Sequence, residues 1–301
     1  MRITQKMMDA GTLADLNRSM ERLSGSQRRM SSLKKVEKPS DAPGDLKALL
    51  GVKARLADGG RYKANIDSAL LSLGDADSRI SYISDQLLSA KETLVRAAGA
   101  SSQDTRAVVA EQLENIIKGI LSEANSVSGG EYVFAGTASG AKPFEAAAGT
   151  DPDGKERIQS VTYSGNGAVR AVDAAPGERA AAAVSGEELA APGAGGLFEN
   201  LIALRQAAAS GADTASLQAG LDASMARLDE LQAVLGARQQ YLAGLRSRLE
   251  SEGLDLEARR SSLEDADLAE ETLAQARSQT AYQAVLAAAA KRSQLSLINY
   301  L

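Results

Sequence analysis

A repeat of leucine in the second half of the chain places the strongest constraint on the fold. From position 217 to position 256, leucines recur at spacings that alternate between four and three residues. A helix turns once per 3.6 residues, so this spacing keeps one apolar stripe turned toward a partner over about 60 Å. No proline interrupts the repeat, although Ser224, Arg238 and Glu252 occupy the same phase. The stretch therefore predicts one long helix that requires a partner.

A second repeat, over residues 66–97, has the same period and carries Ile, Leu or Ala at each of its seam positions. Residues 109–127 carry a shorter version. Because three seams of similar period can bury one another, we expect the partner helices to lie in the same chain. The predicted intramolecular seam comprises Leu73, Ile80, Ile83, Leu87, Leu94, Leu228, Leu231, Leu235, Leu242, Leu245 and Leu249.

The composition argues against several classes of function. The 301 residues include neither Cys nor His, which removes thiol chemistry, histidine bases and the common zinc ligand sets. The net charge is -5, so the chain lacks the large basic field that nucleic acid requires. Only 3% of the residues are aromatic, which favours thin helical seams over a thick globular core. We therefore predict no enzyme activity, no catalytic residues, no cofactor, no metal and no nucleic-acid partner.

No apolar run is long enough to cross a bilayer, and the first twenty residues lack the continuous apolar core of a cleavable signal. We expect no membrane partner. The protein is expected either to stay in the cytosol or to leave it by a route that reads another signal.

The composition changes between residues 129 and 196, which hold thirteen of the 27 glycines and four of the six prolines. This segment predicts a β-containing module. Residues 161–172 are expected to form a hairpin around Asn166 and Gly167, with Val161 opposite Val172. Residues 151–154 resemble part of a calcium loop, but the remaining acidic ligands are missing and a turn is favoured.

Both ends of the chain carry more apolar surface than one partner helix can cover. We expect neighbouring subunits to supply the missing contacts; packing entirely within one chain is the alternative. The predicted intersubunit interface comprises Leu13, Leu16, Met20, Leu23, Leu286, Leu295, Leu297, Ile298 and Leu301.

These patterns predict a mainly α-helical protein: an elongated antiparallel coiled coil or helical bundle built from the N- and C-terminal halves, with a small β-rich outer module inserted in the middle. Three regions are expected. Residues 1–43 and 264–301 would form terminal helices of an inner coiled-coil core, residues 44–128 and 197–263 a helical rod, and residues 129–196 the outer module.

Several motifs occur in a specific order along the chain. They are MRITQKMM at the start, PSDAP at 39–43, GEYVFAGT at 130–137 followed by Pro143-Phe144, YSGN at 163–166, LEDAD at 263–267, AYQA at 281–284 and LSLINYL at 295–301. On these residues the sequence resembles the flagellin superfamily and, within it, the hook-associated proteins of the hook-filament junction. The segments around Tyr132 and Tyr163 favour the junction proteins over filament flagellins.

The resemblance implies a secreted, structural adaptor on the bacterial flagellum that joins a hook-side junction protein to flagellin. Its implied partners are further copies of itself in a homo-oligomeric ring, the hook-side junction protein, flagellin, a cytosolic export chaperone and the flagellar type III export apparatus. Two alternatives stay open. One is a minor flagellin that forms the filament, and the other is a cytosolic coiled-coil scaffold or a four-helix ligand-sensing module.

Overall fold

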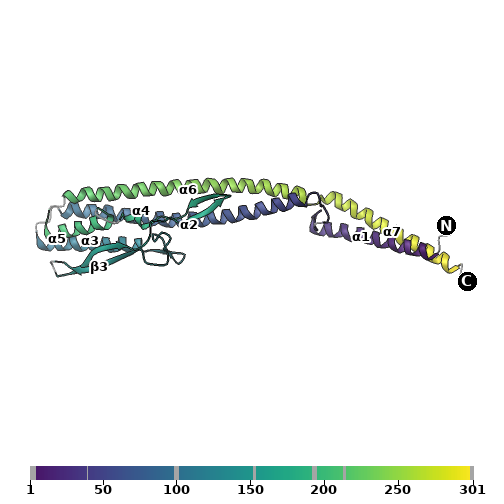
Figure 1. The fold of residues 1–301 in the computed structure, drawn as a ribbon, viewed down its shortest axis with the longest axis horizontal. Helices are drawn as coiled ribbons and strands as arrows, with labels where there is room; N and C mark the ends of the chain where they lie inside the picture. Colours follow the sequence, from purple (N-terminus) through teal and green to yellow (C-terminus); the bar gives the residue numbers. More distant parts are fainter. Residues whose placement is uncertain are drawn as a thin grey trace. The chain divides into compact units, whose positions relative to one another are not determined.

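Long helices from both halves of the chain make up most of the protein (Figure 1). The computed structural model describes residues 5–38, 40–97, 102–151, 154–191, 195–212 and 215–298. The helices are α1 (Gln5–Ser32), α2 (Leu46–Ala97), α3 (Gln103–Ala124), α4 (Gly186–Ala190), α5 (Leu197–Ser210), α6 (Ala215–Glu264) and α7 (Leu268–Ile298). All the strands of the described residues lie between α3 and α4. The predicted fold class, mainly α with a small β-containing module in the middle, is confirmed.

The chain divides into two compact units. The terminal unit comprises Met1–Asp58 and Ser251–Leu301, and the central unit comprises Gly59–Glu250. The predicted division into three regions stays a prediction.

In the central unit, α2 and α6 run antiparallel and are joined by polar pairs along their length. Lys91 lies 2.6 Å from Asp222, and Arg246 lies 2.9 Å from Asp67. Between these pairs, the Gln232 amide donates to Ser81 Oγ at 3.1 Å. The three pairs join early residues of α6 to late residues of α2, and late residues of α6 to early ones. The two helices that carry the repeats therefore run in opposite directions.

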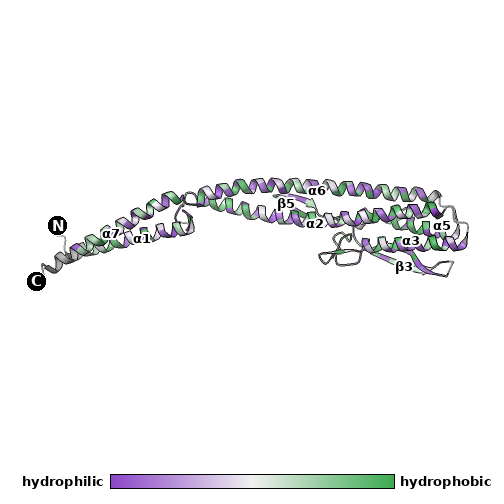
Figure 2. Ribbon diagram, turned by 180° about the vertical axis from the view of Figure 1, so that it is seen from behind, coloured by the Kyte–Doolittle hydropathy of each residue, from purple (hydrophilic) through white to green (hydrophobic). Residues whose placement is uncertain are grey.

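The leucine repeats form the core of the central unit. Of the residues assigned to the intramolecular seam, all but one are buried; Leu249 is partly buried and packs against them. Figure 2 shows hydrophobic and hydrophilic residues alternating along α2 and α6, as expected of helices that bury one side. Ser224, an interruption of the leucine repeat, is also buried; its hydroxyl accepts from the Asn200 amide at 3.0 Å. Arg238, another interruption, donates to the carbonyl of Ala183 at 3.0 Å.

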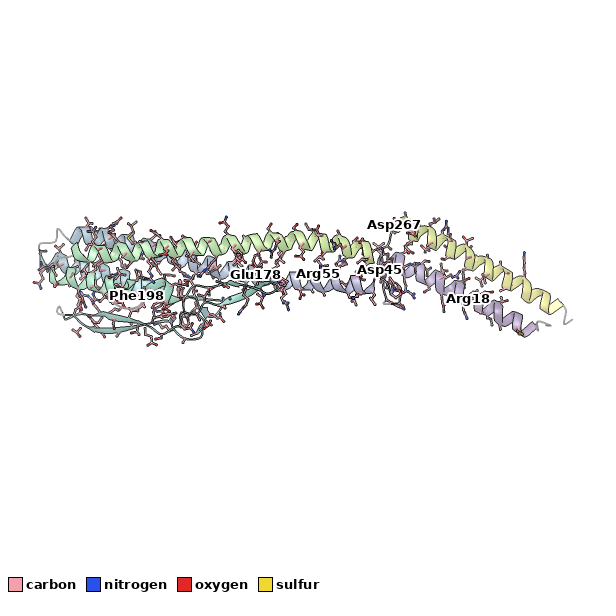
Figure 3. All side chains as sticks on the ribbon, turned by 45° about the horizontal axis from the view of Figure 1, so that its top comes forward. Arg18, Asp45, Arg55, Glu178, Phe198 and Asp267 are labelled. Carbon is pink, nitrogen blue, oxygen red and sulfur yellow. The ribbon has the colours of Figure 1, made fainter. Side chains whose placement is uncertain are left out.

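The described strands form three two-stranded antiparallel sheets. They pair β1 (Val127–Ser128) with β2 (Glu131–Tyr132), β3 (Phe144–Thr150) with β4 (Glu156–Tyr163), and β5 (Ala171–Ala175) with β6 (Glu178–Ala181). An aromatic cluster attaches the β3–β4 hairpin to α5: the ring of Phe144 lies 5.0 Å from that of Tyr163 and 5.5 Å from that of Phe198, which Figure 3 labels.

The predicted hairpin over residues 161–172 is wrong. Tyr163 pairs with Phe144 instead, and its strand ends there. Asn166 does not turn the chain into a second strand, because its side chain holds another loop. Its amide donates to Thr137 Oγ1 at 2.8 Å, and its carbonyl oxygen accepts from the Thr137 backbone N–H at 2.9 Å.

Four charged side chains are buried where β3–β4 meets α3 and α5. Arg205 of α5 donates to Glu114 of α3 at 2.5 Å and to the carbonyl of Ile158 at 2.7 Å. Arg157 of β4 donates to Asp151 at 2.7 Å, and Arg205 lies 3.4 Å from the same carboxylate. The four charged side chains are between 0% and 3% exposed. The Gly154 N–H donates to the carbonyl of Asp151 at 2.9 Å, and the Asp151 carboxylate belongs to this cluster; residues 152 and 153 of the predicted turn lie outside the described residues.

The charges in this cluster balance, two acidic against two basic groups. Burial alone would raise the pKa of Asp151, but hydrogen bonds from Arg157 and Gln159 and the charge of Arg205 bring the pKa below its usual 3.8. A buried ion pair adds little net stability over apolar packing, yet losing one partner leaves an uncompensated charge. The cluster therefore makes the position of the hairpin depend on each of its members.

We predict that Glu114→Gln lowers the free energy of unfolding by about 3–5 kcal/mol, because Arg205 loses the closer of its two buried carboxylate partners. Urea unfolding followed by circular dichroism measures this. Asp104→Asn is the matched control, since Asp104 lies on the same helix and is exposed. Its effect should stay below about 1 kcal/mol. Equal losses in the two variants would contradict the assigned role of burial.

Candidate assembly interface

Helices α1 and α7 lie side by side in the terminal unit (Figure 1). The shielded positions of α1 recur with the heptad period of a two-helix seam. Ser26 is buried, and the half-buried members are Thr12, Leu16, Ser19, Leu23 and Met30. Every second position of the α1 seam is therefore Ser or Thr, so the contact between α1 and α7 buries little apolar surface.

The apolar stripe of α1 is only half covered in a single copy. Of the four α1 residues assigned to the intersubunit interface, Leu16 and Leu23 are half-buried, whereas Leu13 is 61% and Met20 58% exposed. The contact with α7 lies to one side of the stripe, over the Ser and Thr positions. The exposed stripe is apolar surface that a second molecule could cover.

The C-terminal candidates are described only in part. Leu286 of α7 is 41% exposed. The side chains of Leu295, Leu297 and Ile298, and the whole of Leu301, lie outside the described residues. Whether these five residues and the four of α1 contact another subunit stays a prediction.

Backbone hydrogen bonds join the segment after α1 to the break between α6 and α7. The Lys35 N–H donates to the carbonyl of Glu264 at 2.8 Å, and the Ala266 N–H donates to the carbonyl of Leu33 at 2.9 Å. Leu33 has φ of +54°, a left-handed conformation that turns the chain out of α1. We call residues 33–36 and 264–266 the clasp.

The clasp also has an ionic centre. The Glu264 carboxylate is buried and accepts from Lys34 Nζ at 2.8 Å and from Lys53 Nζ, on α2, at 3.0 Å. The hydrogen bond from Lys34 lowers the pKa of Glu264 below its usual 4.5; burial opposes this, and Lys53 adds to it. One helical turn back, Arg29 lies 2.7 Å from Glu271. The chain leaves the clasp at Asp267, labelled in Figure 3, whose carboxylate accepts from the Ala269 N–H at 2.8 Å.

The sequence analysis did not identify the clasp. The sequence does contain a signal for it, namely two segments of opposite charge. Residues 28–38 contain five Lys or Arg, and residues 264–271 contain five Asp or Glu. Among the described residues, no group of three or more His, Cys, Asp or Glu could hold a metal ion. In the same described ranges, no helix combines the length and apolar character needed to span a membrane.

Comparison with known proteins shows that the chain is similar to flagellin-like helical proteins. Residues 219–301, which include most of α6 and all of α7, match the family model of the bacterial flagellin C-terminal helical region. The chain is also 29% identical over 160 residues to flagellar hook-associated protein 3 of Salmonella typhimurium. That alignment spans 52% of this chain and 50% of the Salmonella protein, so it covers about half of each.

Solved structures show the same fold. A putative flagellar hook-associated protein from Vibrio parahaemolyticus is similar with a TM-score of 0.64 and 20% identity, over 75% of this chain and 100% of that one. Hook-associated protein-3 from Legionella pneumophila gives a TM-score of 0.57 and 14% identity, over 70% and 98%. FlgL of Xanthomonas campestris gives 0.56 and 17%, over 69% and 98%. The resemblance to the flagellin superfamily, and within it to hook-associated protein 3, is confirmed.

The lowered pKa of Glu264 predicts that the clasp weakens in acid. Because the folded-state pKa lies below 4.5, the ionic contact stabilises the clasp above about pH 4.5 and is lost as the pH falls through the folded-state value. NMR hydrogen exchange of the Lys35 and Ala266 amides should therefore be about two- to fivefold slower in the wild type than in Glu264→Gln at pH 6, since both lysines are partly exposed. The ratio should approach one as the pH falls below the folded-state pKa of Glu264. A ratio of one already at pH 6 would contradict the contact.

Proposed function

We propose that this protein is a structural component of the bacterial flagellum, secreted and assembled as an adaptor at the hook-filament junction. Two observations together support the proposal. The fold is similar to that of a putative flagellar hook-associated protein over 75% of the chain, and the apolar stripe of α1 is only half covered in a single copy. The relatives are named as hook-associated proteins, and a stripe that one copy cannot bury is what an assembling subunit requires. The role is mechanical, not enzymatic.

Assembly would cover the surface that each lone copy leaves exposed. Neighbouring copies in a homo-oligomeric ring would pack on Leu13, Met20 and Leu286, together with the C-terminal residues 295–301. Fully burying one Leu or Met side chain is worth about 1.5–3 kcal/mol, so two or three such residues add several kcal/mol to each joint. The intramolecular seam of the central unit would carry load from one helix to the next without needing a neighbour.

The remaining partners follow from the proposed place in the flagellum. A hook-side junction protein and flagellin would contact the assembled ring on its two sides. Before assembly, the chain would pass through the flagellar type III export apparatus, and a cytosolic export chaperone would shield the apolar C-terminal helix. The absence of Cys suits a chain that leaves the cell, because no disulfide has to form outside.

A minor flagellin that builds the filament is the second candidate, because residues 219–301 match the flagellin C-terminal region. The two functions differ in position along the flagellum. Immunoelectron microscopy of a tagged chain should show one band at the cell-proximal end of the filament for a junction adaptor. Labelling along the whole filament would favour the flagellin, and the absence of label from flagella would favour a cytosolic scaffold.

We predict that Leu13→Asp combined with Met20→Asp abolishes self-association of the protein while leaving its thermal unfolding within about 0.5 kcal/mol of the wild type. Both side chains are exposed in one copy, so the charges cost little until a neighbour must bury them. Light scattering measures the association. In cells, the variant should release filament subunits into the medium.

Leu71→Asp is the matched control, because Leu71 is 73% exposed on α2 in the central unit. It should leave both association and filament attachment unchanged. Normal filaments on cells that carry the α1 double variant would contradict the proposed interface.

A further inference from the structure

Asn166 and Gly167 form a dipeptide in which the asparagine side chain can react with the backbone that follows it. The nitrogen of the next residue attacks the side-chain carbonyl carbon, and a glycine obstructs this attack least because it has no Cβ. Both residues are exposed, and neither takes part in the proposed assembly interface. The pair is therefore chemically reactive unless the fold restrains it.

The fold holds Asn166 by each of its polar groups. The side-chain amide donates to Thr137 Oγ1 at 2.8 Å, and the side-chain oxygen accepts from the Thr137 N–H at 2.9 Å. In the main chain, the Asn166 N–H donates to the carbonyl of Ala135 at 3.4 Å, and the Asn166 carbonyl accepts from the Tyr163 hydroxyl at 2.9 Å. Turning the side chain toward the Gly167 nitrogen would break both bonds to Thr137.

A glycine allows Thr137 and Asn166 to come this close. Gly136 has φ of +69°, and a Cβ at this position would collide with the main-chain and side-chain oxygens of Asn166. The residue before Thr137 therefore has to be without a side chain for the two segments to meet. The contact depends on the backbone geometry of this turn as well as on the two side chains.

We propose that Asn166 is a latent deamidation site and that Thr137 is the positioning residue that keeps it from reacting. In the reaction, the Gly167 nitrogen forms a bond to Cγ of Asn166 and the bond from Cγ to Nδ2 breaks. The proton of the Gly167 nitrogen passes through solvent to the departing nitrogen, which leaves as ammonia. Water then opens the succinimide ring at one of its two carbonyl carbons and leaves either aspartate or isoaspartate.

The rate of this reaction follows the opening of the contact. Attack occurs only in the fraction of molecules in which the bonds to Thr137 are broken, so the folded-state rate is the unfolded-state rate multiplied by that fraction. From the net strength of two hydrogen bonds, the fold should slow deamidation by roughly five- to a hundredfold.

The isoaspartate product would change the structure. An aspartate side chain at position 166 still accepts hydrogen bonds from the N–H and the hydroxyl of Thr137. Isoaspartate instead routes the main chain through the former side chain and lengthens it by a carbon atom, so the four hydrogen bonds of Asn166 cannot all form. Deamidation would therefore release the segment between β4 and β5 from the turn that contains Thr137.

Peptide mass spectrometry of the full chain during incubation at pH 8 measures the loss of the Asn166 amide. The folded chain should react more slowly than the same chain in urea, by the factor given above. Thr137→Val keeps the shape of the side chain but removes the hydroxyl, so it should speed the folded-state reaction about two- to tenfold. Thr137→Ser retains the hydroxyl and should restore the slow rate.

Thr162→Val is the matched control, because Thr162 is exposed on β4 and its change should leave the rate at Asn166 as in the wild type. Circular dichroism shows whether each variant is folded, and all variants should react equally fast in urea.

Equal rates for the folded and the urea-unfolded wild type would overturn the inference, whether or not any variant folds. A folded Thr137→Val chain that reacts as slowly as the wild type would remove the assigned role of Thr137. The measurement uses the unassembled chain. Its outcome is therefore independent of the proposed function, which fails only if the protein does not assemble on flagella.

Discussion

Everything in this structure follows from the fact that a helix with one apolar stripe must find another helix to cover it. The central unit meets this requirement internally, because α2 and α6 bury a continuous run of Leu, Ile and Ala and the polar pairs along their edges hold them antiparallel. The terminal unit does not. There, Ser or Thr alternates with Leu or Met along the α1 side of the seam, and Leu13 and Met20 stay exposed.

The long helices could be predicted from the sequence because their signal is local and repeated. Each Leu of the 217–256 repeat confirms the phase of the one before it, so a single interruption such as Ser224 does not hide the pattern. The same reasoning found that α1 carries more apolar surface than one partner covers. It did not show which part of the stripe faces α7, since Leu13 and Leu16 are adjacent on a helical wheel.

The β module and the buried charges could not be predicted in the same way. The strands are short, and their partners were chosen by contacts distant in sequence: Tyr163 pairs with Phe144, and Asn166 is bonded to Thr137. Glu114 and Arg205 each look like an ordinary charged residue on a helix. Both residues occupy positions of their helices where apolar residues are expected, and their charges are opposite. This pattern suggests a buried ion pair, but it does not identify Asp151 and Arg157 as the neighbours of that pair.

The two units use buried charge for different purposes. In the central unit, a balanced cluster fixes a hairpin against helices that are already stable, so the charges determine position more than stability. In the terminal unit, packing is weak, and the Glu264 carboxylate with its two lysines, together with the backbone hydrogen bonds of the clasp, joins the end of α6 to the segment after α1. In the proposed assembly, the half-covered stripe of α1 is the surface left for a neighbour, because the α1–α7 seam alternates Ser and Thr with apolar residues and covers little of that stripe.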